Sequence, residues 1–184
     1  MLVNEIMQRA LGVMNTRRTV PGWILVVAFA AYASIAIAGP KAGDVAPAHL
    51  GTTLDGKRIL ATDYPGKAVI VSYWATWCTF CLKELDILNG IQRAASDRVQ
   101  VVTVNIESRM VFKKVSEALS PFEMLVLYDP DGKGRKAYDV RGVPHMVIIG
   151  KDGRIDTVKI GYGEKDLDSI VDSINRAIGA VPAT

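Results

Sequence analysis

The hydrophobic pattern of the chain switches between the two-residue period of a strand and the 3.6-residue period of a helix. Residues 68–74 form an almost continuous β-branched and aromatic run, which is typical of a strand covered by helices on both faces. Residues 79–95 follow with apolar positions at helical spacing and charged positions opposite them, which predicts a helix. A one-sided apolar stripe returns at 167–178 and predicts a second long amphipathic helix.

Shorter segments continue this alternation to the end of the chain. We expect strands at 50–53, 57–60, 101–106, 124–128, 146–149 and 155–161, a helix at 110–119 and a helical turn at 134–138. Asp55-Gly56 and Lys151-Asp152-Gly153 separate neighbouring strands of this set and predict two tight hairpins, the first of them at the N-terminal side. Strands that alternate with helices predict an α/β fold, a central mixed sheet with helices on both faces.

An uncharged segment, Thr19–Pro40, precedes these elements, and its apolar part, Trp23–Ala38, approaches the length of a membrane span. Three arginines lie before it and no basic residue follows until Lys41, so the positive-inside tendency keeps the N-terminus cytoplasmic. Ala36-Ile37-Ala38 also fits a signal peptidase site, which leaves a cleaved signal open. We therefore expect a membrane anchor or signal segment at 1–40, a Gly/Pro/Ala linker at 41–47 and a domain at 48–184.

Composition bounds the size of the domain and excludes one class of partner. The chain has 184 residues, 49% of them hydrophobic, which suffices for one domain with a core and an additional terminal segment. The formal net charge is +3, and the first 38 residues contain three arginines and one glutamate, so the remainder is close to neutral. A nearly neutral domain lacks the positively charged surface that binds a nucleic acid, and we therefore expect no nucleic acid as a partner.

The chain has two cysteines, Cys78 and Cys81, and both stand in one C-x-x-C motif between the 68–74 strand and the 79–95 helix. A disulfide scaffold needs cysteines spread along the chain, so this pair indicates redox chemistry. Residues three apart are neighbours on a helix, so the two sulfurs can close a small ring. The dipoles and free N–H groups at a helix N-terminus favour a thiolate, which makes Cys78 the expected nucleophile.

The surroundings of this motif resemble the thioredoxin superfamily, and within it the membrane-anchored TlpA/ResA-like thiol-disulfide reductases of bacteria. The resemblance covers roughly 43–178 and rests on four features: the segment Tyr73–Cys81, Glu84, the segment Tyr138–Pro144, and Gly153. A bare C-x-x-C is a weak signal. One that follows Trp-Ala-Thr-Trp and precedes Gly-Val-Pro by about sixty residues is highly specific.

The resemblance implies a thioredoxin fold with an N-terminal hairpin and a strand-helix insertion at Val111–Tyr128. It also implies a protein-disulfide reductase without a cofactor, in which Cys78 attacks a substrate disulfide and Cys81 resolves the mixed disulfide. Pro144 is expected in the cis form beside the cysteines. A proline lacks an N–H, so it leaves the backbone of the preceding residue free to pair with an extended substrate.

Further implications concern substrate contacts, partners and location. Trp77, Val143 and Pro144 are expected to bind the substrate. The implied partners are disulfide-containing envelope proteins, as in cytochrome c maturation, and a membrane protein that supplies electrons. Together with the N-terminal segment, the resemblance predicts a bacterial inner-membrane protein with a periplasmic thioredoxin-like domain, or a soluble periplasmic protein if the signal is cleaved.

One departure from the thioredoxin pattern concerns the proton of Cys81. Ser72 stands six residues before the first cysteine, where thioredoxin carries a buried acid. The proton must then go to water or to another group. Glu84 is close enough in sequence, but a glutamate that faces the solvent from the helix is the favoured interpretation.

A second departure is His145, which follows Pro144 where the family usually has threonine. As an imidazolium near Cys78 it would stabilise the thiolate and make the site more oxidising. A histidine that faces the solvent, or that is bonded to the backbone, would leave the sulfurs unaffected. Both interpretations stay open, and His145 is a possible modulator.

Other functions stay open as well. Known C-x-x-C proteins span about 150 mV in reduction potential, so the pair could also serve as a dithiol oxidant. A copper or zinc delivery protein is another alternative, because the chain contains four residues of types that ligate these metals: Cys78, Cys81, His145 and His49. A peroxidase is disfavoured because Val71 and Ala75 stand where peroxiredoxins carry proline and threonine.

Overall fold

The computed structural model describes residues 39–161, 163 and 167–179. The predicted anchor or signal segment at 1–40 therefore lies outside the described residues except for its last two. Among the described residues, no helix combines the length and the apolar character that a membrane crossing requires.

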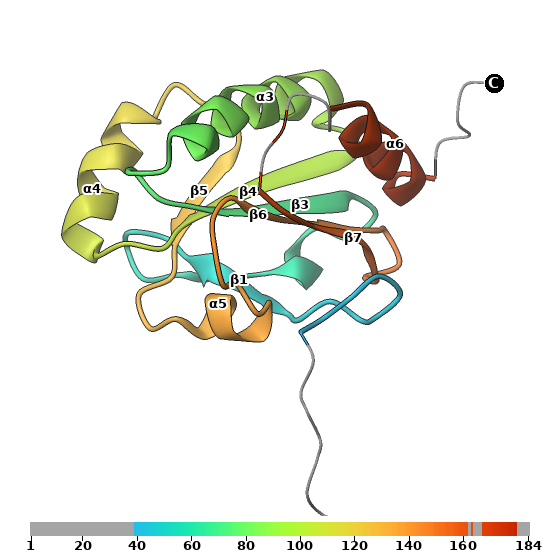
Figure 1. Cartoon of the computed structure of the whole chain (residues 1–184), viewed down its shortest axis with the longest axis horizontal. Coiled ribbons are helices and arrows are strands. Elements are labelled where there is room, and N and C mark those ends of the chain that lie inside the picture. The colour runs from blue at the N-terminus through green and yellow to red at the C-terminus, as the bar shows by residue number, and fades with distance from the viewer. Residues whose placement is uncertain (1–38, 162, 164–166, 180–184) are drawn as a thin grey trace, which may run out of the picture. The chain divides into compact units, whose positions relative to one another are not determined.

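The described residues form one seven-stranded mixed sheet with the order β2-β1-β5-β4-β3-β6-β7 (Figure 1). The strands are β1 His49–Thr52, β2 Arg58–Leu60, β3 Ala68–Trp74, β4 Val99–Asn105, β5 Leu125–Tyr128, β6 His145–Ile149 and β7 Ile155–Ile160. The helices are the short η1 Ala61–Asp63, then α3 Thr79–Ala95, α4 Arg109–Ala118, α5 Lys133–Ala137 and α6 Leu167–Ala177. Strands β3, β4 and β5 are parallel, and the other pairs are antiparallel. The predicted α/β class with a mixed sheet is confirmed, and element bounds differ from the predicted ones by at most two residues.

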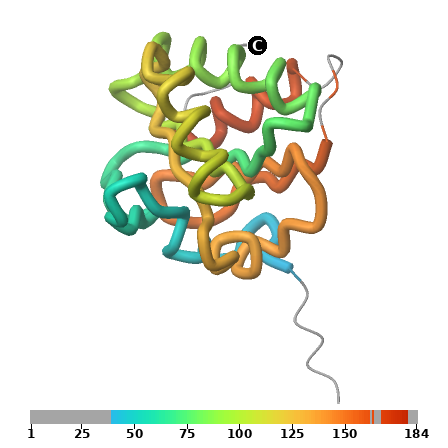
Figure 2. The backbone as a smooth tube through the Cα atoms, turned by 90° about the vertical axis from the view of Figure 1, so that its left-hand side faces the viewer, coloured from blue at the N-terminus to red at the C-terminus, as the bar shows by residue number. Residues whose placement is uncertain are grey.

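The sheet separates two layers of helices. Helices α3, α4 and α6 lie on one face and α5 lies on the other, as both views show (Figures 1 and 2). The central strand β3 is buried along its whole length because its side chains alternate between two apolar cores. Ile70 and Trp74 enter the core under α3 and α6, whereas Val71 and Tyr73 enter the core on the opposite face.

The predicted N-terminal hairpin and the predicted insertion meet at one edge of the sheet. Strand β5 runs parallel to β4, and Thr52 of β1 pairs with Tyr128 of β5 on its other side. Helix α4 is attached to this edge by Phe112, whose ring stacks on that of Tyr128 with centroids 4.6 Å apart. The insertion therefore extends the sheet and supplies a strand for the hairpin to pair with.

The segment 41–47, predicted as a linker, lies along the β6–β7 hairpin. The backbone N–H of Gly43 donates to the carbonyl of Ile155 over 2.8 Å, and that of Ala46 donates to Gly153 over 2.9 Å. These bonds make the segment part of the folded unit that begins at Gly39.

Candidate active site

Cys78 lies between the end of β3 and the start of α3, and it forms a disulfide with Cys81 in the first turn of that helix. The S–S distance is 2.09 Å and the Cα atoms are 5.2 Å apart. The sequence prediction that the two sulfurs can close a ring is confirmed. The structure thus represents the oxidised form of the site.

Cys78 is the N-cap residue of α3. Its sulfur accepts a hydrogen bond from the backbone N–H of Cys81 over 3.2 Å. Such a donor, at the positive end of the helix dipole, stabilises a thiolate after reduction. Cys78 retains 7% exposure and Cys81 only 1%, so an incoming disulfide reaches the sulfur of Cys78 first.

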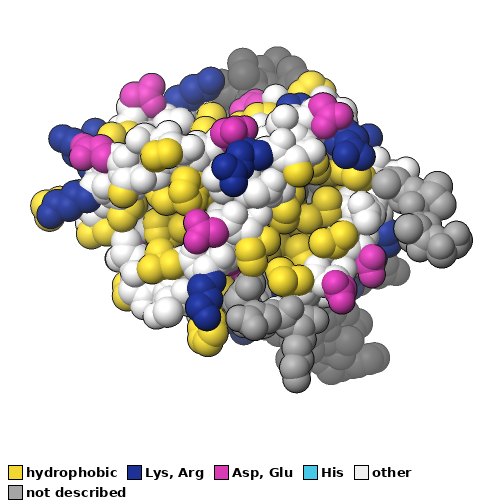
Figure 3. Space-filling view, turned by 90° about the horizontal axis from the view of Figure 1, so that it is seen from above, with side chains coloured by type: hydrophobic (Ala, Val, Ile, Leu, Met, Phe, Trp, Pro, Cys, Tyr) yellow, Lys and Arg dark blue, Asp and Glu magenta, His cyan; other side chains and the backbone are white. Residues whose placement is uncertain are grey.

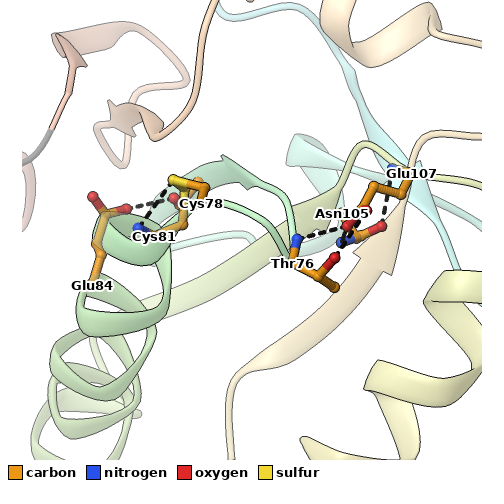
Figure 4. The surroundings of a disulfide bond; sticks show 7 residues. Thr76, Cys78, Cys81, Glu84, Asn105 and Glu107 are labelled. Atoms are coloured by element: carbon orange, nitrogen blue, oxygen red, sulfur yellow. Dashed lines mark hydrogen bonds between the residues drawn. A yellow bond between two sulfur atoms is a disulfide. The ribbon is translucent and has the colours of Figure 1, made fainter.

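Glu84 is buried one turn after Cys81, which corrects the expectation of a solvent-facing side chain. It is 3% exposed, and its carboxylate accepts a hydrogen bond from the hydroxyl of Ser72 over 2.5 Å. Figure 4 shows the carboxylate on the side of the helix turn that carries the disulfide. Burial raises the pKa of Glu84 to about 7, although the bond from Ser72 acts in the opposite direction. A carboxyl group with this pKa can accept or donate a proton at neutral pH.

Pro144 has a cis peptide bond to Val143, as predicted. Val143 packs against both cores, one of which contains the two cysteines. Neither the N–H nor the carbonyl of Val143 takes part in a backbone hydrogen bond with another described residue. These two backbone groups are therefore not part of the sheet pairing that begins at His145.

Trp77 is 69% exposed immediately before Cys78, so its indole is accessible to a substrate. The helical face of the domain carries further apolar side chains between separate charges (Figure 3). The exposed large ones on the helices are Phe80 and Leu82 of α3, Met110 of α4 and Val171 of α6.

His145 lies on the sheet face opposite to the cysteines, which overturns both interpretations of this residue. It is paired with Tyr73 across β6 and β3, and the two rings are 6.3 Å apart in an edge-on arrangement. Tyr73 belongs to the core on the α5 side, whereas the cysteines belong to the core under α3. His145 is 2% exposed, and neither ring nitrogen has a hydrogen-bond partner among the described residues. Burial lowers the pKa of His145, although Asp139 acts in the opposite direction, so the ring is neutral at pH 7.

The ligand set considered for a metal does not assemble. The cysteines are joined to each other, His145 lies on the other face, and His49 lies beside Asp129 and Asp131. Those two carboxylates are already occupied within the described part of the chain. Asp129 accepts from two backbone N–H groups at the start of α5, and Asp131 is paired with Lys133.

Sequence reasoning missed two residues that contact this site. From the sequence, Ser72 is expected only to replace a buried acid, yet it is the partner of Glu84. No sequence prediction assigns a role to Glu107, although it binds the turn that carries Trp77. The available signal for Glu107 was its position just after the strand neighbouring β3, where strand ends gather at one edge of a sheet.

Among the known proteins similar to this chain are thioredoxin-like proteins and thiol-disulfide oxidoreductases. A family model described as the AhpC/TSA family matches residues 42–158. The thioredoxin-like protein YneN of Bacillus subtilis (strain 168) is 30% identical over 141 residues, which span 73% of this chain and 81% of that protein. The thiol-disulfide oxidoreductase ResA of the same strain is 31% identical over 135 residues, or 72% of this chain and 74% of ResA. The crystal structure of the pneumococcal exposed lipoprotein thioredoxin Etrx1 from Streptococcus pneumoniae strain TIGR4 superposes with a TM-score of 0.59 at 33% identity, and covers 70% of this chain and 97% of Etrx1.

Proposed function

The chain belongs to the AhpC/TSA family and is a thioredoxin-fold thiol-disulfide oxidoreductase of the ResA type, and we propose that it acts as a reductase of envelope proteins. The observation that carries this proposal is the combination of an outer sulfur at a helix N-terminus and a buried acid one helical turn after the inner cysteine. The first feature prepares Cys78 to attack a disulfide, and the second prepares Cys81 to resolve the product. Cytochrome c maturation is the proposed setting.

The reaction begins with the reduced pair. The thiolate of Cys78 attacks one sulfur of the substrate disulfide, which breaks that bond, forms a mixed disulfide and releases one substrate thiolate. Cys81 then loses its proton to the carboxylate of Glu84 and attacks the sulfur of Cys78. The Cys78–Cys81 disulfide forms and the second substrate thiolate leaves. Two electrons have passed from the protein to the substrate, and a further dithiol must return them.

The substrate is proposed to bind as an extended segment beside the cis-proline loop. Its backbone would pair with the free N–H and carbonyl of Val143, next to Pro144, in a form of strand addition. Trp77, exposed beside Cys78, would cover an apolar side chain of the same segment. These contacts select a flexible or unfolded region that carries a disulfide.

For location, we propose that residues 1–40 anchor the protein in a bacterial inner membrane with the thioredoxin-like domain in the periplasm. The apolar segment 23–38 and the arginines before it support this orientation. A pneumococcal relative is described as an exposed lipoprotein, which is consistent with work outside the cytoplasm. A membrane protein would supply the electrons, and a cleaved signal would leave the same domain soluble in the periplasm.

The reduction potential of the Cys78/Cys81 pair tests the direction of electron flow. We expect a value near that of thioredoxin, about −270 mV, in redox buffers of known poise. A value near that of DsbA, about −120 mV, would overturn the reductase and favour the dithiol oxidant. The helix N-cap that stabilises the Cys78 thiolate is the feature on which the oxidant would depend.

A trapping variant tests the substrate class. Cys81→Ser in the full chain leaves Cys78 able to attack but removes the resolving thiol, so mixed disulfides accumulate in cells. Cys78→Ser is the matched control and should trap nothing. Adducts that depend on Cys78 and contain envelope proteins support the proposal, and their absence would sink it.

A further inference from the structure

We propose that Glu107 is a positioning residue for disulfide exchange: it holds the turn between β3 and α3 and thereby keeps the sulfur of Cys78 at the helix N-terminus. This inference rests on the proposed function. Glu107 lies between β4 and α4, at the end of the strand that neighbours β3. It therefore belongs to a different segment of the chain from the cysteine motif that it contacts.

Both carboxylate oxygens of Glu107 accept hydrogen bonds from Thr76, two residues before Cys78 (Figure 4). The backbone N–H of Thr76 donates to Oε2 over 2.6 Å, and its hydroxyl donates to Oε1 over 2.9 Å. Burial alone would raise the pKa of Glu107. The bonds from Thr76 and Asn105 outweigh that effect and hold the pKa below its ordinary value. The group is therefore a carboxylate at neutral pH, and hydrogen bonds to a charged acceptor are about twice as strong as neutral ones.

The carboxylate of Glu107 is itself fixed to the sheet. Asn105, fully buried at the end of β4, donates from Nδ2 to Oε2 over 3.1 Å and accepts from the backbone N–H of Glu107 over 3.0 Å. Ile106 donates its backbone N–H to the carbonyl of Trp74 over 3.0 Å, which extends the β3–β4 pairing to the start of the turn. Glu107 thus links a rigid strand end to the turn.

Thr76 is the residue of the turn that is hydrogen-bonded to a different segment of the chain, through Glu107. Within the turn, the backbone N–H of Cys78 donates to Ala75 over 3.1 Å, and the side chain of Trp77 is 69% exposed. The sulfur of Cys78 must stay near the N–H of Cys81 for the helix to stabilise the thiolate. A turn released from Glu107 would let that sulfur move away, so the pKa of the reduced Cys78 thiol should rise.

Loss of the Glu107 charge and loss of its hold on the turn should shift the pKa of Cys78 in opposite directions. Removing a negative charge from the neighbourhood of a thiolate favours the thiolate and lowers its pKa. Loss of positioning acts in the opposite direction. A higher Cys78 pKa after removal of Glu107 therefore cannot come from electrostatics alone, and the folding measurements below exclude unfolding as its cause.

The test uses the reduced full chain as wild type, Glu107→Ala, Glu107→Gln and a control. Glu117→Ala on the exposed side of α4 is the control because it removes the same charge from an exposed position of the helix that follows Glu107. Alkylation of Cys78 by iodoacetamide across pH reports its pKa, and reduction of oxidised glutathione reports its attack. Circular dichroism and urea unfolding report whether each variant is folded.

We expect both Glu107 variants to show a raised Cys78 pKa and Glu117→Ala to match the wild type. Each unit of rise lowers the thiolate fraction about tenfold below the pKa, and the more basic thiolate recovers part of the loss, so attack at pH 7 should be about threefold slower per unit. An unchanged or lowered Cys78 pKa in the folded variants would overturn the role of Glu107. A wild type that reduces no disulfide would instead overturn the proposed function.

A smaller perturbation separates the two bonds of Glu107. Thr76→Val removes the hydroxyl that donates to Oε1 but keeps the backbone N–H that donates to Oε2. Its effect on the Cys78 pKa should have the same sign and a smaller size, and Thr76→Ser should restore the wild-type value. Combined with Glu107→Ala, Thr76→Val should add nothing, because both act through one contact. An additive double variant would contradict the proposed link.

Discussion

Ser72 and Glu84 are joined by a buried hydrogen bond of 2.5 Å that connects the strand before the cysteines to the helix that carries Cys81. The acid that thioredoxin holds on the strand is here on the helix, and the strand supplies a hydroxyl in its place. The carboxyl group stays on the sheet face that carries both sulfurs, because its partner Ser72 alternates with Val71 and Tyr73, which face the opposite core. The site therefore keeps a buried proton acceptor, Glu84, although the strand position carries the neutral Ser72.

Glu84→Gln should slow the resolving step because it removes the acceptor for the proton of Cys81. A positioned general base contributes on the order of 100-fold or more, so we expect a loss of about that size at pH 7. Rapid mixing of the reduced protein with a chromogenic disulfide separates formation of the mixed disulfide from its resolution. Formation should change little, and Glu117→Gln should behave as the wild type. Equal slowing of both steps would show that Glu84 acts on Cys78 instead.

Glu84 also makes the stability of the oxidised protein depend on pH. Its folded-state pKa is about 7, above the ordinary value of 4.5, so the folded state holds the proton more tightly than the unfolded state. The stabilisation is complete below pH 4.5 and is lost as pH rises through 7, with a total of about 3 kcal/mol from the shift in pKa. Urea unfolding of the disulfide-intact protein between pH 4 and 8 measures it. Glu84→Gln should flatten this part of the curve, and parallel curves would contradict the assignment.

Ser72→Ala should raise the pKa of Glu84 further, because the hydroxyl bond is what lowers it against burial. The inflection in the resolving rate should therefore move to higher pH while the maximal rate changes little. The pH profile of mixed-disulfide resolution measures both quantities. Ser116→Ala on the outer helix α4 provides a control, and an inflection that stays in place would remove Ser72 from the proton path.

Most of the fold could be predicted from the local hydrophobic pattern. What could not be predicted depends on contacts between separate elements, which a local pattern does not contain. The run from Ala68 to Trp74 and the stripe of α3 have periods that depend only on the chain itself. Glu84 was misjudged as exposed, although it stands at helical spacing between Cys81 and Leu88, which are both buried. Helical spacing marks the face, but a charged residue on that face is normally assigned to solvent until a partner such as Ser72 is known.

His145 shows a different limit. Alternation along β6 predicts that His145 and Met146 face opposite sides of the sheet, but it does not say which side carries the cysteines. That information comes from the pairing of His145 with Tyr73, a contact across strands more than seventy positions apart in the chain. Glu107 was missed for the same reason, because its contact with Thr76 depends on the order of strands in the sheet.

His145→Leu should stabilise the protein. The buried ring has two nitrogens without hydrogen-bond partners among the described residues, and an apolar side chain of similar size removes that cost, worth about 1 kcal/mol or more. Because burial lowers the folded-state pKa of His145, this residue contributes a loss of stability as pH falls below 6.5, opposite in sign to the contribution of Glu84. The stability gained by the variant should therefore increase as pH falls. Urea unfolding between pH 5 and 7.5 measures both effects.

The same variant tests the position of His145 relative to the sulfurs. Because the ring lies on the opposite face of the sheet, the pKa of the reduced Cys78 thiol should be the same in His145→Leu as in the wild type. Alkylation rates across pH provide this value. A shift in the Cys78 pKa would restore His145 as a modulator of the site.

Trp77→Ala should weaken the reaction with a protein substrate while leaving the chemistry of the sulfurs intact. The indole is 69% exposed, so its removal should change the free energy of unfolding by less than about 0.5 kcal/mol. If it covers an apolar substrate side chain, kcat/KM for a protein disulfide should fall about tenfold, as for a contact worth about 1.4 kcal/mol. Reduction of glutathione disulfide, which offers no apolar side chain for the indole to cover, should stay within about twofold. Both reactions of Met110→Ala, a control that removes a similarly exposed side chain from α4, should also stay within about twofold. An equal loss with both disulfides would mean that Trp77 supports the turn held by Glu107, and that substrate recognition lies elsewhere.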